Sequence, residues 1–170
     1  MLAFRRTPHK VLFVMLQRTN NVSDDPIYWA SVYRGAAVNF RLTAENLVGT
    51  LELKGDGTPA KLTAIPFYFL ISHAIELFLK SALLKRGYVP SDLRKFDRRH
   101  NLEALLELLL GMGLPISEET TMLVRGLSGQ HQQHLLRYHF LINPFMPAPA
   151  TLWPMLDELL MLTRIATHGR

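Results

Sequence analysis

Hydrophobic residues recur at spacings of three and four along much of this 170-residue chain, which is the period of amphipathic α-helices. Asp25 followed by Pro26 is typical of a helix start, because aspartate caps helix N-termini and proline fits the first helical position. The apolar spacing that follows predicts a helix over residues 26 to about 47. A second helix is predicted over residues 63–85 and ends at Gly87. It is apolar on nearly every side, as expected of a helix surrounded by others.

Three further helices are predicted towards the C-terminus. Residues 101–110 carry leucines on one face of a helix. A polar helix over residues 117–138 begins at the capping residue Ser117, and a fifth helix over residues 151–166 begins at Thr151. The pattern as a whole predicts an all-α fold, an antiparallel bundle of four to five helices.

The first 24 residues are predicted to be a poorly defined N-terminal lead-in to a single domain that spans residues 25–170. Their apolar run, residues 11–16, fits either a short strand or a packed extended segment. The basic residues before this run resemble the start of a signal peptide. However, the run is short, Gln17 and Arg18 interrupt it, and no small-residue cleavage site follows. We therefore expect no export and a cytoplasmic protein.

The stretch of residues 65–84 is long enough to cross a bilayer, but His73, Glu76 and Lys80 lie near its middle. Each charge at the centre of a lone spanning helix costs about 2.5–3.5 kcal/mol on insertion scales. We therefore predict a helix buried in the bundle and no association with a membrane. Glu76 lies one turn before Lys80, which is the favourable order for an ion pair and predicts a structural pair at the core or at a dimer surface. The alternative is that the two residues line a ligand cavity.

Composition narrows the function. Apolar residues make up 48% of the chain and charged residues 19%, which excludes a disordered tail. The chain has no cysteine, so disulfides, thiolate zinc sites and cysteine nucleophiles are excluded, and a reducing compartment fits. The formal net charge of +5 favours anionic partners such as nucleic acid or nucleotides.

The common catalytic motifs are absent. The sequence has no glycine-rich phosphate loop, no dinucleotide fingerprint, no His-Glu-x-x-His pair and no glycine-flanked serine elbow. His131 and His134 lie one helical turn apart, but no carboxylate neighbours them in the sequence. They are therefore interpreted as exposed, solvated histidines, and neither a metal site nor a cofactor is predicted.

Four features stand in an order that resembles the HEPN superfamily (higher eukaryotes and prokaryotes nucleotide-binding). They are the helix with Ile75-Glu76-Leu77-Phe78-Leu79-Lys80, the helix start His100-Asn101-Leu102, the polar fourth helix that ends near Leu135-Leu136-Arg137-Tyr138, and the leucine-rich helix at residues 156–162. The resemblance covers residues 26 to about 165. It implies an antiparallel helical bundle that is often dimeric. Members include metal-independent ribonucleases, toxins and catalytically silent binding modules.

Catalytic members of this superfamily carry an arginine followed after four to six residues by a histidine, and Arg125 with His131 fits that spacing. The resemblance implies that His131 would act as general acid or base and that Arg125 would hold the phosphate through its planar fork of donors. RNA supplies its own nucleophile, the 2′-hydroxyl, so two such Arg–His pairs facing one another in a dimer would be sufficient for cleavage. The chain departs from the pattern at Gly126, where a polar residue is common, and Gly129 interrupts the helix pattern further. The alternative is that Arg125 and His131 are solvated residues on a polar helix face.

A basic connector before the third helix is the candidate anion-binding segment. Its candidate residues are Arg94, Lys95, Arg98, Arg99 and His100. Two alternatives remain: the connector is simply solvated, and His100 caps or orients the third helix.

The sequence therefore leads to two main expectations, with a purely structural oligomerisation domain as a third. The first is a non-catalytic HEPN-like module that binds nucleic acid, a nucleotide or a partner protein. The second is a metal-independent endoribonuclease of the toxin or defence type that uses Arg125 and His131. Both include a homodimer, and the resemblance adds an antitoxin or a nucleotidyltransferase as a protein partner.

Overall fold

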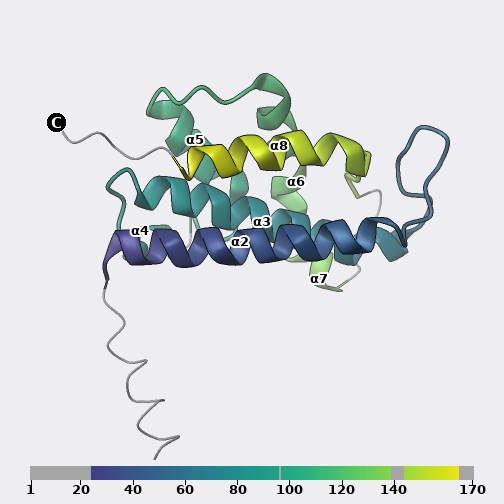
Figure 1. Cartoon of the computed structure of the whole chain (residues 1–170), viewed down its shortest axis with the longest axis horizontal. Coiled ribbons are helices and arrows are strands. Elements are labelled where there is room, and N and C mark those ends of the chain that lie inside the picture. The colour runs from purple at the N-terminus through teal and green to yellow at the C-terminus, as the bar shows by residue number, and fades with distance from the viewer. Residues whose placement is uncertain (1–23, 96, 139–143, 165–170) are drawn as a thin grey trace, which may run out of the picture.

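The computed structural model describes residues 24–95, 97–138 and 144–164, and all regular structure in these ranges is helical. The elements are α2 (Pro26–Val48), η2 (Leu62–Ala64), α3 (Ile65–Leu84), α4 (Pro90–Leu93), α5 (Leu102–Gly111), α6 (Glu118–Gln132), α7 (Leu135–Tyr138) and α8 (Pro149–Leu162). Figure 1 shows them packed into one bundle, and the predicted all-α class is confirmed. The predicted lead-in, apart from its last residue, lies outside the described residues.

Helices α2 and α3 run antiparallel and form the most extensive helix pair of the bundle (Figure 1). Helix α2 begins as predicted, because the Asp25 carboxylate accepts a hydrogen bond of 2.9 Å from the Ile27 amide and Pro26 occupies the first turn. Its fully buried residues are three alanines spaced seven apart, Ala30, Ala37 and Ala44. Such small side chains let the two backbones approach closely, and the Ser81 hydroxyl of α3 donates a hydrogen bond of 2.8 Å to the Ala30 carbonyl.

Helix α3 is the centre of the core. Fifteen of its twenty residues are buried, and it packs against α2, α5, α6, α7 and α8. The segment Leu62–Leu84 is long and apolar enough to cross a membrane, but 61% of its most apolar 18-residue window is buried inside the fold. That burial is typical of a core helix. The chain leaves the helix end through Gly87, whose φ of 95° lies in the left-handed region that glycine adopts without strain.

Helix α5 begins one residue later than predicted. The Asn101 side chain accepts a hydrogen bond of 3.0 Å from the Ala104 amide, so Asn101 is the N-cap and His100 does not cap this helix. His100 instead adopts a φ of 63°, a left-handed conformation that is uncommon for a residue with a side chain. This conformation turns the chain immediately before α5.

Two helix boundaries differ from the prediction. The polar helix begins at Ser117 as expected, but α6 ends at Gln132, because His134 takes a φ of 57° and breaks the helix before the single turn of α7. Helix α8 begins at Pro149 rather than at Thr151, since proline fits the first turn and the Thr151 hydroxyl donates back to the Ala148 carbonyl at 2.8 Å. Its predicted end lies outside the described residues.

Candidate functional site

The most polar feature of the interior surrounds Glu76, in the middle of α3. The side chain is 3% exposed, and one of its oxygens, Oε1, lies 2.6 Å from the Lys80 ammonium one turn later. Both residues are buried. The two side chains that the sequence suggested as a structural pair are therefore placed in contact inside the bundle.

Two histidines from other parts of the chain bind the second oxygen of Glu76. His131 Nε2, from α6, lies 2.8 Å from Oε2, and His100 Nδ1, from the turn before α5, lies 3.1 Å from it. His73 Nδ1 is 3.9 Å from the same oxygen. We call these five residues, Glu76, Lys80, His73, His100 and His131, the Glu76 cluster. It ties α3, α5 and α6 together at one point.

Electrostatics keep Glu76 ionised. Burial raises the pKa of Glu76, but the hydrogen bond from His131 and the adjacent Lys80 charge outweigh burial and hold that pKa far below its usual range. Glu76 is thus a carboxylate at neutral pH, and a carboxylate only accepts hydrogen bonds. His131 Nε2 and His100 Nδ1 must therefore be the nitrogens that carry the donated protons.

The Glu76 cluster also contains donors of the kind that bind Zn²⁺. Ligand atoms of His73, Glu76 and His131 all lie within 4.8 Å of one another. A cation there would have to displace two histidine donors from Oε2 and would face the Lys80 ammonium beside Oε1. Repulsion between the cation and the Lys80 ammonium favours the hydrogen-bonded arrangement over a metal centre.

The sequence did not predict the Glu76 cluster, and the prediction for His131 was wrong. His131 was interpreted as exposed and solvated, but it is 3% exposed. The carboxylate that it binds lies 55 residues earlier in the chain, so no local spacing marks the pair. The signal that was available is the charge of Glu76 within an apolar helix, because a buried carboxylate requires donors from somewhere.

Arg125 occupies a different environment from His131. Its side chain is 47% exposed and lies against the outer side of α5, 2.6 Å from Glu107 and 3.7 Å from Glu103. These carboxylates raise the pKa of Arg125. The two residues that the resemblance pairs are therefore directed at different helices within one chain, His131 at α3 and Arg125 at α5.

Gly126 follows Arg125 for a reason of packing. A Cβ atom placed there would lie 2.5 Å from the Phe145 ring, closer than any real contact allows. The Gln130 side chain holds the Phe145 backbone in place with hydrogen bonds of 2.9 and 3.1 Å. Glycine at position 126 thus leaves room for an aromatic ring against α6.

Arg94, Lys95 and Arg99 of the basic connector are exposed, whereas Arg98 and His100 are partly buried, with side chains 25% and 23% exposed. Arg94 is 53% and Lys95 58% exposed, and they pair with acidic groups, Arg94 with Asp24 at 3.5 Å and Lys95 with Asp92 at 2.6 Å. Arg99 is exposed as well. His100 departs from the predicted anion-binding group because it turns inward to Glu76.

Arg98 combines two contacts within this connector. Its guanidinium lies 3.5 Å from the Asp97 carboxylate and 5.9 Å from the centre of the Tyr88 ring. An arginine over a ring face is held in place while its outer donors stay available.

Comparison with known protein families and curated proteins by sequence, and with solved structures by fold, finds no match. The described residues form an all-helical bundle, and the family of the chain is not identified.

Proposed function

We propose that this chain is a non-catalytic HEPN-like module that binds RNA through Arg94, Lys95, Arg98 and Arg99. The observation that carries the proposal is a contrast in placement. These four cations lie at or near the surface of one short connector, whereas His131, the residue needed for proton transfer, is buried and held by Glu76. The first arrangement suits phosphate contacts, and the second suits structural stabilisation.

The ion pairs of the connector leave it open to phosphates. Asp24 and Asp97, the partners of Arg94 and Arg98, are 75% and 69% exposed. Exposed pairs of this kind contribute about 0–1 kcal/mol each, so a polyanion can replace the carboxylates at little cost. Release of counterions from the RNA then adds to the binding free energy and makes it dependent on salt.

The proposal is tested with a fluorescently labelled single-stranded RNA. The triple variant Arg94→Gln, Arg98→Gln and Arg99→Gln should lower the affinity by about tenfold or more and flatten the dependence on salt, because up to three phosphate contacts are lost. Arg125→Gln is the matched control, since it also removes an exposed arginine. Wild-type affinity in the triple variant, or an equal loss in the control, would contradict the proposal.

The ribonuclease alternative rests on the spacing of Arg125 and His131 in α6 and calls for a separate measurement. RNA degradation in the presence of a chelator is compared between wild type and Arg125→Ala, with light scattering to establish whether a dimer forms. Arg125 is preferred to His131 for this purpose, because its exposed side chain can be removed without opening the core. Metal-independent cleavage that disappears in Arg125→Ala would replace the binding proposal with the catalytic one.

A further inference from the structure

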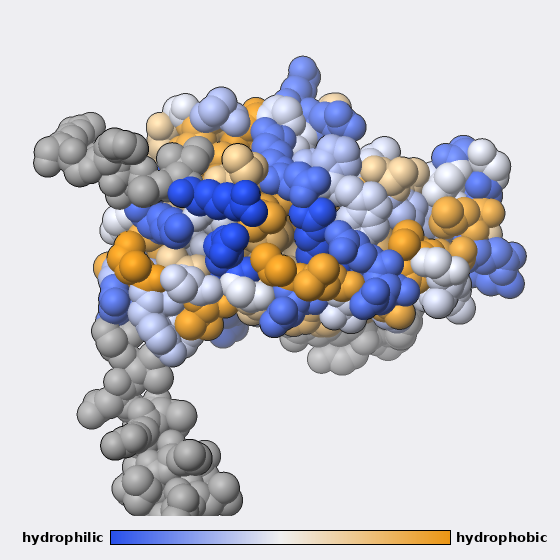
Figure 2. Space-filling model, in the orientation of Figure 1, coloured by the Kyte–Doolittle hydropathy of each residue, from blue (hydrophilic) through white to orange (hydrophobic). Residues whose placement is uncertain are grey.

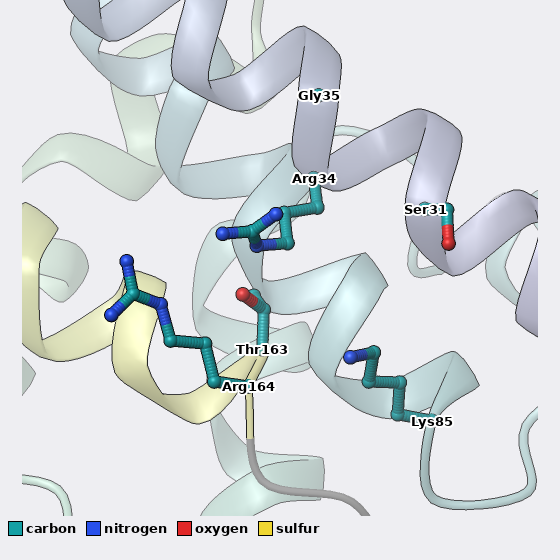
Figure 3. Close-up of a pocket in the computed structure, with 6 residues that line it drawn as sticks. All are labelled: Ser31, Arg34, Gly35, Lys85, Thr163 and Arg164. Atoms are coloured by element: carbon teal, nitrogen blue, oxygen red, sulfur yellow. The ribbon is translucent and has the colours of Figure 1, made fainter.

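A cationic pocket lies at the end of the bundle where the first turns of α2 meet the ends of α3 and α8. It has a volume of about 480 Å³ and is lined by Ser31, Arg34, Gly35, Lys85, Thr163 and Arg164. Figure 2 shows strongly hydrophilic side chains gathered along the seam between α2 and α8. In Figure 3 the side chains of Arg34 and Arg164 both extend to the left, whereas Lys85 lies at the lower right of the pocket.

The described lining of this pocket is rich in cations. Three of its six described lining residues are cations, and none of the six is acidic. Arg34, Lys85 and Arg164 are separated by about 50 and 80 residues in the sequence, so no local run of basic residues announces the site. Three like charges around one cavity raise the local potential and favour an anion in it.

Two of the three cations have a structural explanation. Lys85 is the C-cap residue of α3, and Arg164 follows the end of α8 at Leu162. Cations stabilise helix C-termini, where the last carbonyl groups carry partial negative charge. For these residues, stabilisation of the helix ends competes with ligand binding as the reason for their position.

Arg34 has no such explanation. It lies in the N-terminal half of α2, so it compensates no helix C-terminus. Its Nε is buried and makes no hydrogen bond within the described residues. Because Nε is shielded, an anion in the pocket would instead accept hydrogen bonds from the terminal nitrogens of the Arg34 guanidinium, which Figure 3 shows at the extended end of the side chain. Arg34 is therefore the residue that distinguishes a ligand site from helix capping.

The lining also indicates the class of ligand. The Ser31 hydroxyl donates to the Ile27 carbonyl and the Thr163 hydroxyl to the Leu160 carbonyl, so recognition depends on the cations. None of the described lining residues is aromatic, so they provide no platform on which a base would stack. The volume is within the range of small-molecule pockets, about 300–1,000 Å³. We propose that this pocket binds a small anion of the diphosphate class, with Arg34 as its central contact.

The test measures binding of inorganic pyrophosphate and orthophosphate by calorimetry to the full chain. Wild type should bind pyrophosphate more tightly, because it offers more charge to the three cations. Arg34→Gln should lower the pyrophosphate affinity by about tenfold, as expected for one charge-assisted hydrogen bond. Lys61→Gln removes one charge from an exposed cation that belongs neither to the pocket lining nor to the connector, and it should stay within about twofold of wild type. Equal binding of pyrophosphate by Arg34→Gln and wild type, or no binding by wild type, would overturn the proposal.

Thermal unfolding provides the second readout. Pyrophosphate should raise the Tm of wild type by mass action but leave that of Arg34→Gln almost unchanged. Should Arg34→Gln fail to fold, the exposed Arg164→Gln takes its place with the same expected loss of affinity. The pocket does not depend on the connector. Arg34→Gln should therefore bind RNA within about twofold of wild type. The pyrophosphate assay tests this inference and the RNA assay tests the proposed function, so either can fail without the other.

Discussion

Replacement of Glu76 by glutamine is the most informative perturbation of the fold. Glutamine keeps the size and shape of the side chain but removes the charge. Lys80 would then be a buried ammonium without its counter-ion, and the contacts of His100 and His131 would fall on a neutral amide. The variant therefore tests whether the Glu76 cluster is held together by charge.

The expected loss of stability in Glu76→Gln is large. Glu76 is 3% and the Lys80 side chain 8% exposed, so neither group is screened much by water. Removal of one partner from a buried ion pair costs about 3–5 kcal/mol, because the remaining charge is left uncompensated. Substitution of both partners, Glu76→Gln with Lys80→Met, should recover a large part of that loss, since no unpaired charge then remains in the core.

Urea unfolding followed by circular dichroism measures these differences at equilibrium. Glu107→Gln is the control, because Glu107 also pairs with a cation, Arg125, but its side chain is 50% exposed. The free energy of unfolding of Glu107→Gln should be less than about 1 kcal/mol below that of wild type. The reasoning fails if Glu76→Gln is as mild as Glu107→Gln, or if the double variant is no more stable than Glu76→Gln.

The same carboxylate gives the folded state a dependence on pH. The pKa of Glu76 is lower in the folded protein than its ordinary value of 4.5. The unfolded chain therefore binds the proton more readily, and the stabilisation is fully present above pH 4.5 and is lost as the pH falls below that value. As the pH falls below 4.5, wild type should lose stability more steeply than Glu76→Gln, and parallel curves in that range would contradict this assignment.

Three further predictions concern helix packing and capping, each measured as a free energy of unfolding. Gly126→Ala should destabilise α6, because the new Cβ meets the Phe145 ring. Gly129→Ala has no atom within 4 Å of its new Cβ and should stabilise the helix by about 0.5–1 kcal/mol. A change of the same sign in both variants would refute the packing argument. Ala37→Leu should cost about 1–3 kcal/mol by overpacking the contact between α2 and α3, and an unchanged midpoint would refute it. Asn101→Ala should cost about 1 kcal/mol through loss of the α5 N-cap, and an unchanged free energy of unfolding would contradict that role of Asn101.

The fold was predictable from the sequence to the extent that helix signals are local. Asp25 with Pro26, Ser117 and Gly87 each act through their own neighbouring backbone, and each begins or ends a helix as expected. Thr151 was misleading, because threonine also fits inside a first turn by donating back to a carbonyl, and Pro149 two residues earlier was the better signal. Local capping rules thus locate helices to within a few residues.

The Glu76 cluster and the cationic pocket were not predictable in the same way. His131 reaches Glu76 across 55 residues, and Arg34 and Arg164 line one pocket across about 130 residues. Their proximity follows from which helices pack together, which a single sequence does not specify. An unbalanced charge in an apolar helix indicates that partners exist but does not indicate where they come from.

The relation between Arg125 and His131 leads to a last prediction. Each residue of an α-helix advances by about 100°, so six residues place the two side chains about 120° apart around α6. The helix is continuous from Glu118 to Gln132, which is why one side chain lies against α5 and the other against α3. Residues that share no partner have independent effects on stability.

Arg125→Leu should therefore cost less than about 1 kcal/mol, since the side chain is exposed, and His131→Leu about 1–3 kcal/mol, since a buried donor to Glu76 is lost. The double variant should show the sum of the two losses to within about 0.5 kcal/mol. A larger coupling energy would mean that Arg125 and His131 act on a common group, as the two halves of a catalytic pair would. Additivity together with unchanged RNA binding would assign His131 to the stability of the bundle and leave RNA recognition to the connector.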